Sequence, residues 1–105
     1  MIRFILFIFI LLSLLAFLAK VIKISDGDTI TVLSGKEQTK VRLYGIDAPE
    51  KKQDYGQRSK QFLASLIAGQ MVEVEPKGKD RYKRTLGIIY YKGQDINAQM
   101  VLNGY

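Results

Sequence analysis

The spacing of apolar and polar residues changes several times along this chain of 105 residues, and each change marks an expected structural element. Alternation with a period of two, rich in β-branched residues, is typical of strands that bury one face. The expected strands cover residues 21–24, 29–33, 39–46, 71–75 and 85–91. In the third of them, Val41 and Leu43 share one face, while Arg42 and Tyr44 share the other.

Polar stretches that contain glycine or proline separate the expected strands. They predict a hairpin loop at 34–38, a charged loop at 47–55 and a basic loop at 76–84. Pro76 is expected to end the strand before it, because proline cannot donate a ladder hydrogen bond.

Two segments have helical features. From about Gly56 the apolar residues follow a period near 3.6, and Gly69 is expected to stop the helix. Its apolar stripe consists of Phe62, Leu63, Leu66 and Ile67. Asp95 is a favourable N-cap for a short helix over 96–102, which Asn103 and Gly104 would end.

Three strands, a helix, two strands and a short helix match the order of a small Greek-key barrel of the OB type. The expected fold class is therefore α+β, mainly β, with a five-stranded barrel, one longer helix and one short helix. Element order alone leaves other small α+β folds open. We expect an N-terminal hydrophobic helix to precede the barrel.

Residues 4–19 form a nearly unbroken apolar run between two basic residues. The run is short for a spanning helix, which needs about 20 apolar residues. It fits a signal peptide or an uncleaved membrane anchor, and a buried core helix is the third alternative. We therefore divide the chain into a leader at 1–19, which contacts a membrane through residues 2–19 if uncleaved, and a domain at 20–105. Either kind of leader predicts export: a secreted or periplasmic domain, or one anchored outside the cytoplasm.

Composition restricts the chemistry that is available. The chain has no cysteine, which excludes disulfides, zinc–thiolate sites and thiol nucleophiles, and no histidine, which excludes Ser-His-Asp triads. Acid–base chemistry at neutral pH must then use Glu, Asp, Tyr, Lys or water. The net charge of +6 suits a polyanion such as nucleic acid or an acidic membrane surface. Taken alone, it is equally compatible with solubility.

Several carboxylates stand beside expected strand ends. Asp28 follows a turn and Asp47 stands at the exit of another strand, so both can face one cation if those ends adjoin. Asp26 shares the face of Asp28 if the backbone stays extended. The alternative for Asp26-Gly27-Asp28-Thr29 is a simple tight turn, because Asp-Gly is favoured there.

Glu50 stands three residues after Asp47, across Pro49, which restricts the loop. A carboxylate in this place can accept a proton from an attacking water, which is the role of a general base. The alternative is a solvated loop glutamate.

Arg42 and Arg84 supply positive charge to the same set of motifs. Attack on a phosphodiester builds negative charge on the phosphoryl oxygens, and a guanidinium can donate two hydrogen bonds to them. Tyr82, inside the basic run 77–84, can stack on a base or donate to a phosphate. A packing tyrosine within a solvated loop is the alternative.

Together these segments resemble the thermonuclease family, also called staphylococcal-nuclease-like domains. The matching segments are Asp26-Gly27-Asp28-Thr29, Arg42 through Ile46-Asp47-Ala48-Pro49-Glu50, Tyr55-Gly56-Gln57, Asp80-Arg81-Tyr82-Lys83-Arg84, and Asn97 with Gly104. The resemblance covers about residues 21–105.

This resemblance implies an OB-type barrel and calcium-dependent hydrolysis of DNA and RNA that leaves 3′-phosphate ends. It implies these roles: Ca²⁺ ligands Asp28, Asp47 and the backbone carbonyl of Ala48; Asp26 in the outer shell; Glu50 as the base or the residue that positions the water; Arg42 and Arg84 as phosphate clamps; Arg81 and Tyr82 along the nucleotide site. We expect a monomer with nucleic acid as its substrate.

The sequence departs from the family pattern in two places. Lys83 stands where many members have glycine, and the chain ends at Tyr105, where members usually continue through a strand-like segment and a further helix. We therefore expect a C-terminally truncated domain of marginal stability. Two other functions stay open: a non-catalytic nucleic-acid-binding or partner-binding module, which includes an inactive truncated nuclease, and a small membrane-anchored structural protein.

Overall fold

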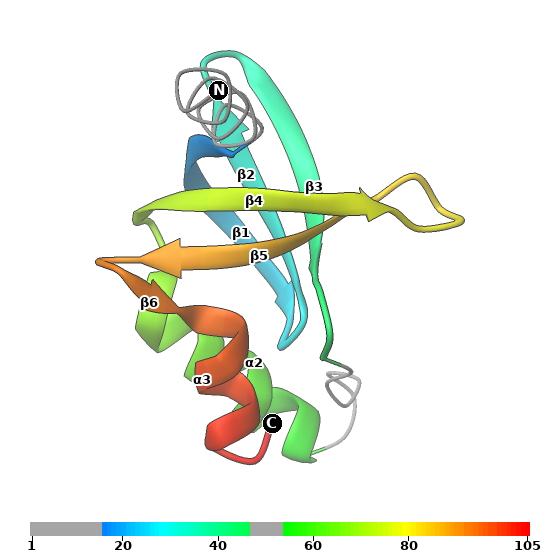
Figure 1. Cartoon of the computed structure of the whole chain (residues 1–105). Coiled ribbons are helices and arrows are strands. Elements are labelled where there is room, and N and C mark those ends of the chain that lie inside the picture. The colour runs from blue at the N-terminus through cyan, green and yellow to red at the C-terminus, as the bar shows by residue number, and fades with distance from the viewer. Residues whose placement is uncertain (1–15, 47–53) are drawn as a thin grey trace, which may run out of the picture.

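The computed structural model describes residues 16–46 and 54–105 (Figure 1). Its elements are β1 (Phe17–Asp26), β2 (Thr29–Ser34), β3 (Glu37–Leu43), α2 (Asp54–Ile67), β4 (Met71–Lys79), β5 (Thr85–Tyr91), β6 (Gln94–Asp95) and α3 (Ile96–Leu102). Apart from the two-residue β6, their order is the one that the sequence predicted.

The strands form a barrel because the two ends of the sheet meet. The sheet order is β3-β2-β1-β4-β5-β6, and β3 also pairs with β5. This closing pair is parallel, whereas every other pair of neighbouring strands is antiparallel. The result is a closed barrel of β1–β5, with α2 and α3 together at one end (Figure 1). The expected OB-type fold class is confirmed.

Alternating residues of the strands fill the barrel, and both helices add to its core. The large fully buried side chains are Val21, Ile30, Val32, Val41, Leu43, Val72, Val74 and Ile89 from the strands, Leu63 and Ile67 from α2, and Ile96 and Met100 from α3. Each of them contributes about 1.5–3 kcal/mol relative to exposure. The predicted stripe of α2 is confirmed, with Phe62 and Leu66 packed at its edge.

The first strand begins at Phe17, three residues before the expected start of the domain. Phe17 pairs with Val74 of β4, and Ala19 is completely buried. The sequence did not indicate this start, because the first residues of the strand belong to the apolar run and show no alternation of apolar and polar residues. The predicted N-terminal helix falls largely on residues 1–15, which lie outside the described residues. Within the described ranges, no helix combines the length and apolar character needed to cross a membrane.

Proline does not end β4, contrary to the prediction from sequence. The strand runs through Pro76 to Lys79, and its register against β5 shifts between Pro76 and Gly78. β1 pairs with β4 only as far as Val74, so the next residues form an edge on that side. Edges and bulges are the places where a strand tolerates a missing N–H.

The hairpin between β2 and β3 is tighter than expected, and β3 is shifted along the chain. Its turn consists of Gly35 and Lys36, with Gly35 at a φ of 61°. β3 ends at Leu43 because the chain turns at Tyr44 and Gly45, three residues before the expected strand end. Ile46, the last described residue before 47–53, therefore lies directly beside Arg42.

Candidate active site

Asp28 lies in the turn between β1 and β2 and is only 8% exposed. The hydroxyl of Thr29 donates to its Oδ1 at 2.9 Å, and the Leu43 N–H donates to its backbone carbonyl at 2.7 Å. The tight-turn interpretation is therefore correct, and the same turn fixes the Asp28 carboxylate. Gly27 and Asp28 form a turn, so the extended backbone that would place Asp26 on the same face as Asp28 is absent. Asp26 pairs with Thr29 across this turn.

Arg42 joins Asp28 to the exit of β3. Its Nη2 lies 3.4 Å from Oδ2 of Asp28, and its Nη1 donates to the Ile46 carbonyl at 2.9 Å. The side chain keeps 23% exposure, so part of it faces solvent. The strand ends that carry Asp28 and Ile46 therefore adjoin, which was the condition for a shared cation. Asp47, Ala48 and Glu50 lie outside the described residues, and their roles stay predictions.

The turn between β4 and β5 is organised by Asp80, to which the sequence analysis gave no role. Its Oδ1 accepts the backbone N–H groups of Tyr82 and Arg84, each at 2.9 Å, and its Oδ2 accepts from Arg84 Nε at 2.6 Å. Sequence reasoning missed this signal: in a turn, an aspartate side chain can accept the backbone N–H of the residue two positions later. Because of this network, Arg84 is held in one orientation.

Desolvation alone would raise the pKa of Asp80, but hydrogen bonds from Arg84 and Tyr82 outweigh it and lower that pKa below its usual value. A carboxylate whose pKa is lower in the folded state stabilises the fold at pH values above its pKa in the unfolded state, near 4. This stabilisation is lost as the pH falls through the pKa of the folded state. We therefore expect Asp80→Asn to destabilise the fold at pH 7 and to matter progressively less in acid. Urea unfolding of both proteins between about pH 7 and pH 3 measures this. An equal difference at every pH would contradict the ionised network.

Arg81, Tyr82 and Arg84 gather at the tip of this turn. The guanidinium carbons of Arg81 and Arg84 lie 4.9 Å and 5.5 Å from the centre of the Tyr82 ring. Tyr82 is 64% exposed, so it is no packing tyrosine. The three predicted residues are brought together as a cationic surface with an accessible aromatic face, which suits a nucleotide.

Lys83 has a φ of 64°, in the left-handed region that favours glycine. A glycine, which the resemblance noted above implies at this place, would adopt this conformation without strain. We expect Lys83→Gly to raise the free energy of unfolding by about 0.5–1 kcal/mol, because relief of strain outweighs the gain in unfolded entropy. The matched control is Lys79→Gly in β4, which should destabilise by a similar amount. Chemical denaturation measures both, and a loss of stability in Lys83→Gly would contradict this expectation.

The register between β3 and β5 relates the two arginines. Arg42 pairs with Leu86, and Arg84 stands two residues before Leu86. Since alternate residues of a strand share a face, the register predicts Arg84 on the outer side with Arg42, with Cα atoms roughly 8 Å apart. Two guanidinium groups at this spacing can contact one phosphate.

Asn97, in the first turn of α3, supports this region from inside. Its Nδ2 donates to the carbonyls of Tyr44 at 2.9 Å and Gly87 at 3.0 Å, and its Oδ1 accepts from the Ile89 N–H at 3.1 Å. The side chain is buried, and it ties the exit of β3 to β5. The sequence analysis noted Asn97 only as a matching residue and gave it no role.

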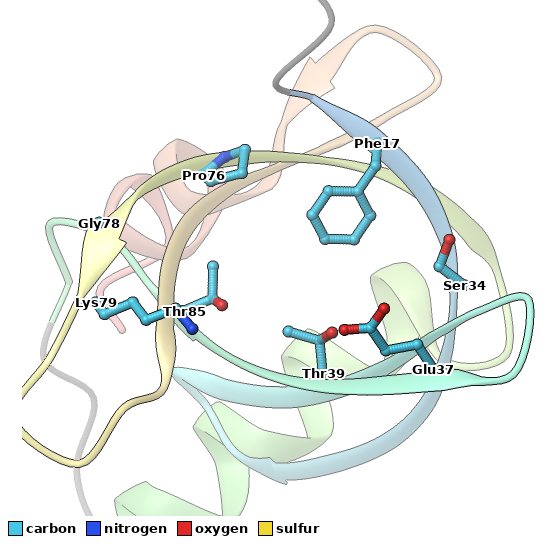
Figure 2. Close-up of a pocket in the computed structure, with 8 residues that line it drawn as sticks. All are labelled: Phe17, Ser34, Glu37, Thr39, Pro76, Gly78, Lys79 and Thr85. Carbon is cyan, nitrogen blue, oxygen red and sulfur yellow. The ribbon is translucent and has the colours of Figure 1, made fainter.

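A pocket of about 570 Å³ opens at the barrel end away from the helices (Figure 2). Its lining residues are Phe17, Ser34, Glu37, Thr39, Pro76, Gly78, Lys79 and Thr85. None of them is a predicted site residue, and only Thr85 directly follows one. The candidate active site is therefore the outer surface around Arg42 and not this cavity.

Oxygen donors for a cation are few within 16–46 and 54–105. In these ranges no three acidic side chains lie close enough to hold a metal ion. Among these residues, Asp28 offers a nearly buried carboxylate at the exit of β3, which accepts from the Thr29 hydroxyl and pairs with Arg42. Any further ligand must come from a neighbouring segment.

Comparison with known proteins decides the family. Residues 40–105 match the family described as staphylococcal nuclease homologue. The chain belongs to this family. It is 54% identical over 86 residues to a protein named uncharacterized endonuclease from Haemophilus influenzae, covering 81% of this chain and 48% of that protein. It is 46% identical over 97 residues to a micrococcal nuclease of Shigella flexneri, covering 84% and 56%.

A further relative, also named uncharacterized endonuclease, comes from Escherichia coli O157:H7 and is 45% identical over 86 residues. That match covers 81% of this chain and 56% of the relative. The chain thus spans about half the length of the curated relatives it matches. The resemblance inferred from the motifs is confirmed at the level of the staphylococcal nuclease family.

Proposed function

We propose that this protein is a nuclease that hydrolyses phosphodiester bonds of DNA, RNA or both, with calcium as its cofactor and 3′-phosphate products. The observation that carries the proposal is the Arg42 side chain, whose guanidinium contacts Asp28 and the Ile46 carbonyl and which keeps 23% exposure. Family membership and the names of the relatives support the same reaction class.

The available donors fit calcium. Ca²⁺ takes six to eight oxygen ligands, mainly from carboxylates, carbonyls and water. We assign Asp28, Asp47 and the backbone carbonyl of Ala48 to it, with Asp26 in the outer shell. The support is geometric, since Arg42 holds Ile46, the residue before Asp47, beside the Asp28 carboxylate. When bound, the ion supplies positive charge beside the scissile phosphate.

The protein's own groups divide the remaining work. Arg42 and Arg84 donate to the phosphoryl oxygens and stabilise the negative charge that develops as water attacks. Glu50 accepts the proton of that water, or holds the water in line with the phosphorus. Arg81 and Tyr82 contact the neighbouring nucleotide through charge and stacking. Asp80 keeps Arg84 oriented before substrate arrives, which reduces the entropy lost on binding.

Calcium titration tests this assignment. We expect the purified chain to cleave a labelled oligonucleotide with calcium and not with a chelator, and to release 3′-phosphate ends. Calcium should also raise the thermal midpoint of the parent chain and not that of Asp28→Asn, because a ligand that binds only the folded state stabilises it. Binding of the oligonucleotide without cleavage at any calcium concentration would favour the non-catalytic module.

Export is a separate part of the proposal and depends on the apolar run at 4–19. We propose that the protein acts outside the cytoplasm, either free or anchored. Cell fractionation of the full chain tests this, and recovery of the protein in the cytoplasmic fraction alone would contradict it.

A further inference from the structure

Lysines lie in line with Arg42 on the outer face of the barrel. Lys23 of β1 pairs with Thr31 of β2, and Thr31 pairs with Lys40 of β3, so the three residues form one row across the sheet. Two residues further along β3, Arg42 pairs with Thr29 of β2, which pairs with Asp26 of β1. Lys40 and Arg42 share the outer face of β3, about 7 Å apart along the strand.

A bulge in β1 places Lys23 in this row. Val21 pairs with Val32 and Lys23 with Thr31, so Ile22 is the extra residue. Val21 is buried, and without the bulge Lys23 would have the same inward orientation, because alternate residues share a face. With the bulge, both Ile22 and Lys23 are exposed. Redirecting one side chain is a typical effect of a β-bulge.

Beside Lys23 the row opens into a groove between β1 and α2, of about 480 Å³. Lys20 and Lys60 line it together with Lys23, and Ala64 and Gly69 are among its small lining residues. All the charged residues that line the groove are lysines. A chain carrying negative charge could therefore lie in it without meeting a carboxylate of the lining.

These lysines are not neutralised by the described part of the protein. Within residues 16–46 and 54–105, no ion pair involves Lys20, Lys23, Lys40 or Lys60. The outer face of β4 differs, because Glu73 and Glu75 are found there and Lys77 lies 2.8 Å from Glu75. Positive charge is therefore concentrated on the face that leads to Arg42.

We propose that Lys20, Lys23, Lys40 and Lys60, here called the lysine track, bind the phosphate backbone of a single nucleic-acid strand that extends from the candidate active site. The proposal rests on the proposed function and adds to it a preference for long strands. A single line of cations can follow one backbone, and the Thr31 hydroxyl within the row can donate to a phosphate. Its continuity with Arg42 favours the substrate over an acidic membrane surface.

Equilibrium binding in a chelator, where hydrolysis is prevented, tests the track. The probes are labelled single strands of about 16 and about 4 nucleotides, the range of site sizes of OB folds. We expect Lys23→Gln/Lys40→Gln to weaken binding of the longer strand about tenfold at low salt and to make its salt dependence shallower by about 1.4 in log–log slope, because two phosphate contacts are lost. The short strand, held at the active site, should lose much less affinity.

The matched control is Lys36→Gln/Lys92→Gln, which removes the same charge from two exposed lysines in turns away from the track. Equal losses in both double variants would overturn the proposal, since net charge alone would then explain binding. Unchanged affinity for the long strand, with loss of binding to vesicles of anionic phospholipid, would overturn it in favour of a membrane surface. If the parent hydrolyses nucleic acid and either of these two results is obtained, only the lysine track is refuted. If binding depends on the track but the parent does not hydrolyse nucleic acid, only the proposed nuclease function is refuted.

Discussion

Replacing Arg42 with lysine is expected to lower kcat for nucleic-acid hydrolysis by about 10²- to 10³-fold, the usual cost of losing one donor to a developing oxyanion. The guanidinium contacts Asp28 Oδ2 and the Ile46 carbonyl through different nitrogens. A lysine ammonium keeps the charge beside Asp28, but as a point donor it cannot contact both partners and a phosphate together. The loss should fall mainly on kcat, because the missing contact strengthens in the transition state.

Arg58→Lys is the matched control, since Arg58 is exposed on α2 and none of the proposed contacts involves it. Its kcat should equal that of the parent. Steady-state kinetics with calcium in excess, together with the thermal midpoint of each variant, separate a catalytic loss from unfolding. A lysine variant with parental kcat would show that Arg42 serves only to fix Asp28 and the exit of β3.

Asn97→Ala is expected to lower the free energy of unfolding by about 3 kcal/mol or more. The change leaves the Ile89 N–H and the Tyr44 carbonyl without their side-chain partner, while the Gly87 carbonyl keeps the backbone N–H of Tyr44. Each buried polar group left unsatisfied costs about 1–3 kcal/mol. For a domain of this size such a loss approaches the whole stability, so thermal and urea unfolding should show a large shift.

Asn103→Ala makes the same substitution at the exposed C-cap that directly follows this helix. Its side chain donates one hydrogen bond, to the Gln99 carbonyl at 2.8 Å, and water can replace that bond. We expect a loss below about 1 kcal/mol. Similar losses in the two variants would contradict a special role for Asn97. A folded Asn97→Ala protein with lower affinity for calcium would further link this residue to the exit of β3.

The predicted residues of the candidate site fall into two groups. Arg81, Tyr82 and Arg84 were predicted within one short basic segment, and the structure gathers them because a single turn holds them. Asp28 lies in the turn between β1 and β2 and Arg42 lies in β3, and the β2–β3 register brings them together. Asp47, Ala48 and Glu50 lie outside the described residues and remain predictions.

Local periodicity and capping chemistry were enough to predict most elements of this protein. The mostly apolar run over 85–91 predicted β5 with its observed bounds, and Asp95 caps a helix over 96–102 by accepting the N–H of Ala98 at 2.9 Å. Both features depend on residues within a few positions of each other, so sequence alone contains them. The family motifs indicated the staphylococcal nuclease family in the same way.

Only the tertiary structure decided how distant segments meet. The parallel pairing of β3 with β5 closes the barrel and brings Arg42 of β3 towards Arg84, which directly precedes β5, and no local pattern encodes the pairing of segments so far apart. Burial of Ala19 against β4 overrode the apparent continuity of the N-terminal apolar run. The bulge at Ile22, which turns Lys23 outward, likewise depends on the register against β2. In each case the deciding energy comes from pairing and burial between strands, which a single segment does not contain.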